Sequence, residues 1–86
     1  MYLHLGQNVV VPQTAVIGVF DMDNTTSSYI TRKFLRDAEK AGRLISVSEE
    51  LPDSFVVCGD GSEIKIYLSQ LSTQTLMKRS ETMRFE

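Results

Sequence analysis

Several residue types that stabilise small proteins or take part in catalysis and metal binding are scarce in this sequence. Its 86 residues include one cysteine, one histidine, two prolines and no tryptophan. A single cysteine, Cys58, cannot form an internal disulfide, which excludes a disulfide-rich secreted scaffold and favours a reducing compartment such as the cytoplasm. His4 has no second histidine and no cysteine near it in the sequence. The chain therefore offers no zinc ligand set, and we expect neither a metal nor another cofactor.

Long apolar runs are also absent. No segment approaches the roughly 18 consecutive apolar residues of a membrane span, and the first residues lack the basic stretch of a signal peptide, so we expect neither. The length fits one domain, residues 1–86. Such a domain buries only roughly 60–65% of the surface that its unfolded chain exposes, so its core is marginal without a metal, a disulfide or a partner chain.

Local patterning predicts an α+β fold, with a small, mostly antiparallel sheet, one central helix and a C-terminal helix. Two short apolar runs, Tyr2–Leu5 and Val9–Val11, predict a hairpin, and its turn contains Gly6 and Asn8, which tolerate positive φ. Pro12 lacks an amide donor and ends the second strand. The continuous apolar run from 15 to 20 predicts a strand that is buried on both faces at the centre of the sheet.

The clearest element is a helix from Tyr29 to Ala41, preceded by the polar, turn-forming run from 21 to 28. Its apolar residues recur with helical spacing, which predicts one buried stripe that consists of Ile30, Phe34, Leu35, Ala38 and Ala41. Gly42 follows at the position where a left-handed C-cap is needed.

The second half of the chain predicts three strands and a helix. Residues 44–47 form a short strand, and residues 55–58 and 63–68 form a hairpin around a glycine-rich turn. Alternation on the last strand predicts one buried face and one solvent-exposed face. The buried face carries Ile64, Ile66 and Leu68. The exposed face carries Glu63, Lys65 and Tyr67. Residues 72 to about 83 predict a final helix, capped by Ser72 or Thr73, that packs Leu76 and Met83.

One short motif matches known catalytic chemistry. Asp21-Met22-Asp23-Asn24-Thr25 follows an apolar strand and resembles the first motif of haloacid-dehalogenase-type phosphatases, which would make Asp21 the nucleophile and Asp23 the acid. That fold also needs a later lysine and a second acidic pair on a wide parallel sheet. Each parallel crossover takes about 30 residues, and the chain after Thr25 is too short. We therefore expect a solvated turn that leads into the next helix.

Other candidate sites are weaker. The turn Gly59-Asp60-Gly61-Ser62 has too few glycines and no following lysine to form a phosphate-binding loop. Cys58 ends an apolar run with no activating histidine in view, which favours a small core residue over a nucleophile. We expect no enzyme activity and no catalytic residues.

Charge is distributed unevenly along the chain. The nine basic and eleven acidic residues give a net charge of −2, which by itself argues against a nucleic-acid partner. Residues 25–45 contain five basic and two acidic residues, a net charge of +3, whereas residues 46–64 contain five acidic and no basic residues, a net charge of −5. Basic and acidic residues are therefore concentrated in two different segments of the chain.

The basic residues of the predicted helix gather on one side. Arg32, Arg36, Lys40 and Arg43 are spaced so that they lie opposite the apolar stripe or beside it. Three interpretations are open. The row could contact phosphates, or it could be an ordinary solvated face with pairs such as Lys33–Asp37, each worth about 0.2–0.5 kcal/mol. It could also contact the acidic 46–64 region of another copy of the chain.

The order of these segments resembles the RemA/RemB family of small extracellular-matrix (biofilm) regulators of Gram-positive bacteria. The resemblance covers the chain from Met1 to about Arg79. It consists of many short matches in fixed order, at residues 1–6, 9–11, 17–21, 24–28, 30–32, 38–42, 51–57, 66–69 and 75–76. It implies a non-enzymatic cytoplasmic regulator, because RemA is a DNA-binding activator of matrix operons that assembles into a ring of identical subunits.

The resemblance also implies the partners, which are further copies of the chain in a ring, a RemA-type paralogue and DNA. The DNA-contacting arginines of RemA match residues 12–14 here, which are neutral, and residues 49–54, which are acidic and repel phosphate. The helix does match, so if the chain contacts DNA we expect Arg32, Lys33, Arg36 and Lys40 to do so without sequence specificity. The alternative is a protein–protein interaction module that assembles with a RemA-type paralogue and does not bind DNA.

Overall fold

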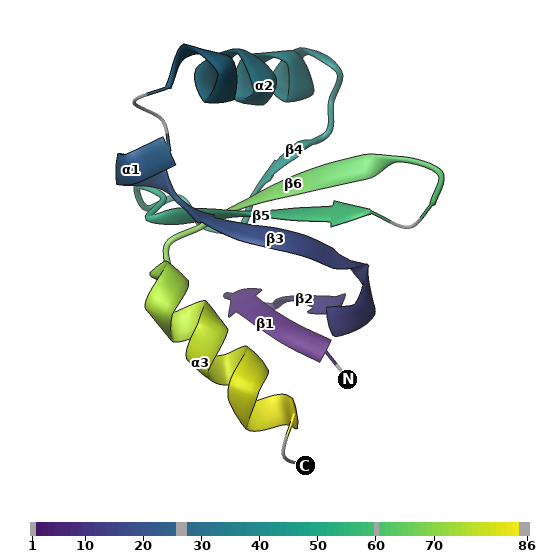
Figure 1. Ribbon diagram of the computed structural model, residues 1–86, viewed down its shortest axis with the longest axis vertical. Helices are drawn as coiled ribbons and strands as arrows, with labels where there is room; N and C mark the ends of the chain where they lie inside the picture. Colours follow the sequence, from purple (N-terminus) through teal and green to yellow (C-terminus); the bar gives the residue numbers. More distant parts are fainter. Residues whose placement is uncertain (1, 26–27, 60, 85–86) are drawn as a thin grey trace.

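The chain folds into three layers around a four-stranded sheet (Figure 1). The computed structural model describes residues 2–25, 28–59 and 61–84, the side chains of 24, 25 and 80–84 excepted. One helix covers one face of the sheet, and a two-stranded hairpin and the C-terminal helix cover the other. The fold is α+β with mostly antiparallel strand pairs, which confirms the predicted class.

Strands and helices follow one another in the predicted order. The strands are β1 (Tyr2–Gly6), β2 (Val9–Pro12), β3 (Val16–Asp21), β4 (Leu44–Ser46), β5 (Ser54–Gly59) and β6 (Ile64–Ser69). The helices are α1 (Met22–Thr25), α2 (Tyr29–Lys40) and α3 (Thr73–Arg84), and a 3-10 turn, η1 (Gln13–Ala15), joins β2 to β3. In the described part of the chain no helix is long and apolar enough to cross a membrane.

The strand order of the sheet is β3-β5-β6-β4, and this order corrects one prediction. The apolar run from 15 to 20 predicts a central strand, but β3 lies at an edge and pairs with β5 alone in its sheet. A register shift between Val16 and Gly18 interrupts the alternation of β3, and Ile17 is 63% exposed. A continuous apolar run shows that both faces of a strand are apolar, but it does not show that both are covered.

β5 is the strand that is buried on both faces. Its residues from 54 to 58 are all buried, and they alternate between two separate hydrophobic clusters. Phe55 and Val57 point to the face that α2 covers, here called the α2 face. Val56 and Cys58 point to the opposite face, here called the hairpin face.

The hairpin face is covered by β1, β2 and α3. Its cluster of buried side chains consists of Leu3, Leu5, Val11, Val47, Val56, Cys58 and Leu76. Tyr67 packs against this cluster from β6, so the prediction of a wet face on that strand is wrong at this residue. The β1–β2 hairpin supplies a second apolar layer on this face. β6 therefore packs on both faces, although its sequence alternates between apolar and polar residues. Leu76 is packed as predicted, whereas the side chain of Met83 lies outside the described ones.

The α2 face has a smaller cluster, in which Ala38, Phe55, Val57 and Ile66 are buried. α2 rests on the sheet through Ala38 and the half-buried Leu35. The predicted buried stripe is partly wrong, because Ile30 and Phe34 are 77% and 42% exposed and Ala41 is exposed too. Helical spacing identifies an apolar stripe, but only one edge of this stripe meets the sheet.

The turns and caps agree with the sequence in most places. The β1–β2 turn has positive φ at Gly6 (119°) and Gln7 (50°) rather than at Asn8. Gly42, with φ 75°, follows the C-terminal end of α2 as predicted. Ser72 caps α3, since its Oγ accepts a hydrogen bond from the Thr75 amide at 3.1 Å.

Two buried serines of neighbouring strands tie the layers together. Ser54 and Ser69 are fully buried and stand opposite each other in the β5–β6 register. The Ser69 hydroxyl donates to the Leu5 carbonyl at 2.6 Å and accepts from the Leu71 amide at 3.0 Å. The Ser54 hydroxyl donates to the Leu71 carbonyl at 2.7 Å. These bonds connect the sheet to β1 and to the segment that enters α3.

We expect the substitution Ser69→Ala to lower the free energy of unfolding by about 1–3 kcal/mol, because it leaves a buried amide and a buried carbonyl short of a partner. Urea unfolding measures this change. The matched control is Ser46→Ala at an exposed strand position, which should change stability by less than about 0.5 kcal/mol. Equal effects of the two substitutions would contradict a tying role for Ser69.

Candidate interaction surface

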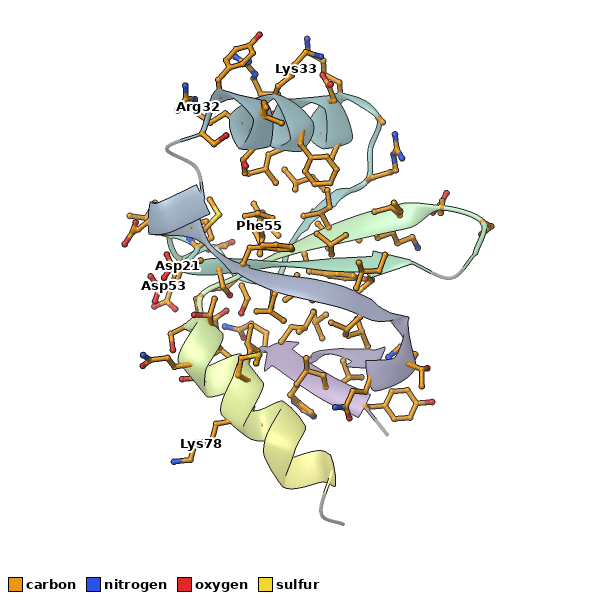
Figure 2. The ribbon with its side chains drawn as sticks, viewed as in Figure 1. Asp21, Arg32, Lys33, Asp53, Phe55 and Lys78 are labelled. Carbon is orange, nitrogen blue, oxygen red and sulfur yellow. The ribbon has the colours of Figure 1, made fainter. Side chains whose placement is uncertain are left out.

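The basic residues that the sequence predicts to meet DNA lie on the outer side of α2. Arg32, Lys33, Arg36 and Lys40 are all exposed. Figure 2 shows Arg32 and Lys33 extending from the helix away from the sheet. Arg32, Arg36 and Lys40 are four residues apart and therefore share one side of the helix. The structure thus brings these side chains to one surface that a partner can reach.

One of these basic residues, Lys33, takes part in a weak, exposed ion pair. Lys33 Nζ lies 3.2 Å from Asp37 Oδ2, with 57% and 59% of the two side chains exposed. Exposed pairs four residues apart on a helix are worth about 0.3–0.5 kcal/mol, because water and salt screen them. A phosphate or a carboxylate of a partner can therefore compete with Asp37 for Lys33.

On the side of α2 that faces the sheet lies a small apolar hollow between the helix and the start of β6, here called the Phe34 groove. Its volume is about 80 Å³, and it is lined by Phe34, Asp37, Ala38, Arg43, Ile64 and Ile66. Ile64 also lines a wider hollow of about 350 Å³ that continues to Ile17 on β3. The Phe34 groove therefore opens onto the part of the α2 face that the helix leaves uncovered.

Three of the five acidic residues in the 46–64 stretch lie at the other end of the sheet, on the loop between β4 and β5. Glu49, Glu50 and Asp53 are exposed, and Leu51 between them is 91% exposed. The loop lies beside the end of β3, because the Asp53 carbonyl accepts a hydrogen bond from the Met22 amide at 3.1 Å. Figure 2 shows Asp21 and Asp53 next to each other at this end. Glu63 lies instead directly before β6, next to Ile64 of the Phe34 groove, so the acidic stretch of the sequence is divided between the two ends of the sheet.

The phosphatase-like residues lie at the end of β3 and in the short helix α1. Asp21 Oδ1 accepts a hydrogen bond from the Asp23 amide at 2.8 Å, at the point where β3 ends and α1 begins. The neighbour of β3 is the antiparallel strand β5, whereas the phosphatase motif follows a strand of a parallel sheet. Asp60, an acidic residue that follows β5, lies outside the described residues. The predicted solvated turn is wrong over residues 22–25, which form the helix α1.

Cys58 is a core residue, as predicted. It is 6% exposed, and it is a free thiol. Burial raises the pKa of the Cys58 thiol, because the thiolate loses its contact with water. The thiol is therefore protonated at neutral pH, and a protonated thiol is a poor nucleophile.

Two parts of this surface have little or no signal in the sequence. The Phe34 groove combines α2 with β6, two segments that are distant along the chain. The exposure of Leu51 has a weak signal, because it is an isolated apolar residue within an acidic run. An apolar residue in such a run is as compatible with a buried anchor as with an exposed contact.

These observations define a class of protein. It is a small α+β domain with a charged and partly apolar outer surface. Among residues 2–25, 28–59 and 61–84, no three His, Cys, Asp or Glu side chains gather in a way that could hold a metal ion. The exposed basic residues of α2 and the Phe34 groove make an interaction surface the candidate functional site.

Comparison with known proteins supplies the family. The family model described as extracellular matrix regulatory protein A-like (RemA-like) matches residues 2–79. Extracellular matrix regulatory protein B of Bacillus subtilis (strain 168) is 34% identical over 83 residues, which cover 96% of this chain and 94% of that protein. The chain therefore belongs to the RemA-like family. The two names support a role as an extracellular matrix regulator, and a regulator's name suggests a non-enzymatic role.

The raised pKa of Cys58 predicts a loss of stability at alkaline pH. The folded chain keeps the thiol proton at pH values where the unfolded chain loses it, so the stabilisation is complete below about pH 8.5 and falls as the pH rises further. We expect the difference in free energy of unfolding between the native chain and Cys58→Ala to be constant near pH 7 and to shrink above about pH 8.5. All other titrating groups are common to both chains. A constant difference up to about pH 10 would contradict this role of burial.

Proposed function

We propose that the protein is a cytoplasmic, non-enzymatic regulator of extracellular matrix (biofilm) gene expression that acts as a homo-oligomeric ring and contacts DNA through α2. The observation that supports DNA contact most directly is the exposed row of Arg32, Lys33, Arg36 and Lys40 on one side of a helix. Cations spaced along a rigid helix attract the phosphate backbone without selecting a sequence. Membership of the RemA-like family supports the regulatory role.

Self-association is supported by the size and surface of the chain. An 86-residue domain has a marginal core, and its α2 face leaves Ile17, Phe20, Phe34 and Ile64 between 38% and 63% exposed. Contiguous exposed apolar surface of this kind is typical of a contact with another protein. An oligomer also brings several copies of α2 together, so that weak phosphate contacts add up along one DNA molecule.

Binding to a generic duplex at several salt concentrations tests the DNA contact. We expect binding at about 50 mM salt that weakens steeply towards 200 mM. The double substitution Arg36→Glu/Lys40→Glu should weaken binding at least tenfold. It should also reduce the slope of log K against log salt by about 2, roughly 0.9 for each lost phosphate contact.

The matched control for charge is Lys65→Glu/Lys78→Glu, which changes the net charge equally at two exposed positions outside α2. This control should retain most of the slope of log K against log salt. Binding that is absent at low salt, or that does not change with salt, would reject contact between α2 and phosphate.

The second candidate function is an interaction module that assembles with a RemA-type paralogue and never binds DNA. The exposed acidic loop with Glu49, Glu50 and Asp53 favours it, because such a loop repels phosphate and attracts a basic protein. Light scattering on the chain alone and mixed with a purified RemA-type protein tests this candidate. A new mixed species without DNA binding supports it, and unchanged masses on mixing reject it.

A further inference from the structure

Leu51 is the most exposed of the large apolar side chains in the described ranges, with 91% of its surface open to solvent. The loop that presents it is held on both sides of the residue. Before Leu51 the Val47 amide donates to the Leu68 carbonyl at 2.9 Å, and after it the Asp53 amide donates to the Ser69 carbonyl at 2.8 Å. Leu51 is therefore displayed on an anchored loop, which lowers the entropy that binding would cost.

The Phe34 groove has a shape that suits one aliphatic side chain. Its volume is about 80 Å³, about half of the 150 Å³ cavity that accommodates benzene in another protein. Its walls are mainly apolar, formed by Phe34, Ala38, Ile64 and Ile66. Phe34 and Ile64 are 42% and 38% exposed, so an inserted side chain would bury apolar surface on both partners.

The charges around the two features are complementary. Glu49, Glu50 and Asp53 lie close to Leu51 in the sequence and are exposed, and Arg43 lines the groove. Of the two acidic residues beside the groove, Asp37 is paired with Lys33 at 3.2 Å, and Glu63 is 3.8 Å from Lys65. The free acidic loop therefore meets a surface with a basic excess.

Leu51 cannot fill the groove of its own chain. It precedes β5, which begins at Ser54 opposite Ser69, whereas Ile64 in the groove stands opposite Gly59 at the other end of the hairpin. Five steps along a strand separate these ends by roughly 17 Å. The two complementary features thus lie at opposite ends of the sheet. Only a second chain can bring them together.

We propose that Leu51 of one copy inserts into the Phe34 groove of the next copy and that Glu49 and Glu50 face Arg43 there, which leaves the outer, basic side of α2 uncovered. This contact rests on the self-association in the proposed function and assigns it a surface. Because the two patches differ, the contact is head-to-tail, and it closes into a ring when the rotation between copies permits.

Sedimentation or light scattering against concentration tests the contact. The substitution Leu51→Ser should raise the dissociation constant of self-association about 10- to 100-fold, which corresponds to the lost burial of one leucine. The control Met77→Ser changes a 52% exposed residue on α3 and should change it less than about threefold. A native chain that remains monomeric at all concentrations overturns the proposed oligomer itself. A native oligomer that Leu51→Ser leaves unchanged overturns this contact alone.

A mixing experiment tests the head-to-tail arrangement. Leu51→Ser keeps the groove and Phe34→Ser keeps the leucine, so each variant alone should be mainly monomeric. An equimolar mixture should form a dimer of about twice the 9.7 kDa chain mass and nothing larger, because it contains one intact pair of surfaces. Ile64→Ser replaces Phe34→Ser if the latter loses its helical circular dichroism. A folded mixture that remains monomeric would overturn the contact.

Discussion

The burial of β5 on both faces is the constraint on which the rest of this structure depends. Its side chains divide the apolar core into two clusters, and each cluster needs its own cover. The hairpin face receives β1, β2 and α3, whereas the α2 face receives a single 12-residue helix. The hydroxyls of the buried Ser54 and Ser69 tie the sheet to β1 and to the segment that enters α3.

The unequal cover explains why the candidate interaction surface lies on the α2 side. One helix is too narrow for the α2 face, so Phe20 stacks on Phe55 with ring centroids 5.1 Å apart yet remains 39% exposed. The same arrangement turns the basic side of α2 outward and leaves the Phe34 groove open beside it. Incomplete packing and charge separation thus have a common origin in the three-layer fold. Both make this face the natural place for a partner.

Much of the fold can be predicted from local patterns in the sequence, and most of the surface cannot. The hairpins, α2 and the cap of α3 follow from apolar spacing and turn residues, which act within a few positions along the chain. The order of the strands does not follow from such local patterns, because an apolar run like that from 15 to 20 fits an edge strand as well as a central one. The basic row was predictable from four-residue spacing, whereas the exposure of Ile30 and the Phe34 groove depend on which flank of α2 meets the sheet.

The central claim is that a second copy completes the α2 face, and chemical cross-linking tests it most directly. Two chains, one with Glu50→Cys beside Leu51 and one with Asp37→Cys at the edge of the Phe34 groove, are mixed and treated with a short bismaleimide; the native Cys58 is buried and does not compete. The account predicts a cross-linked dimer from the mixture at a far higher yield than from a Glu50→Cys and Met77→Cys mixture. Equal yields from the two mixtures would contradict it.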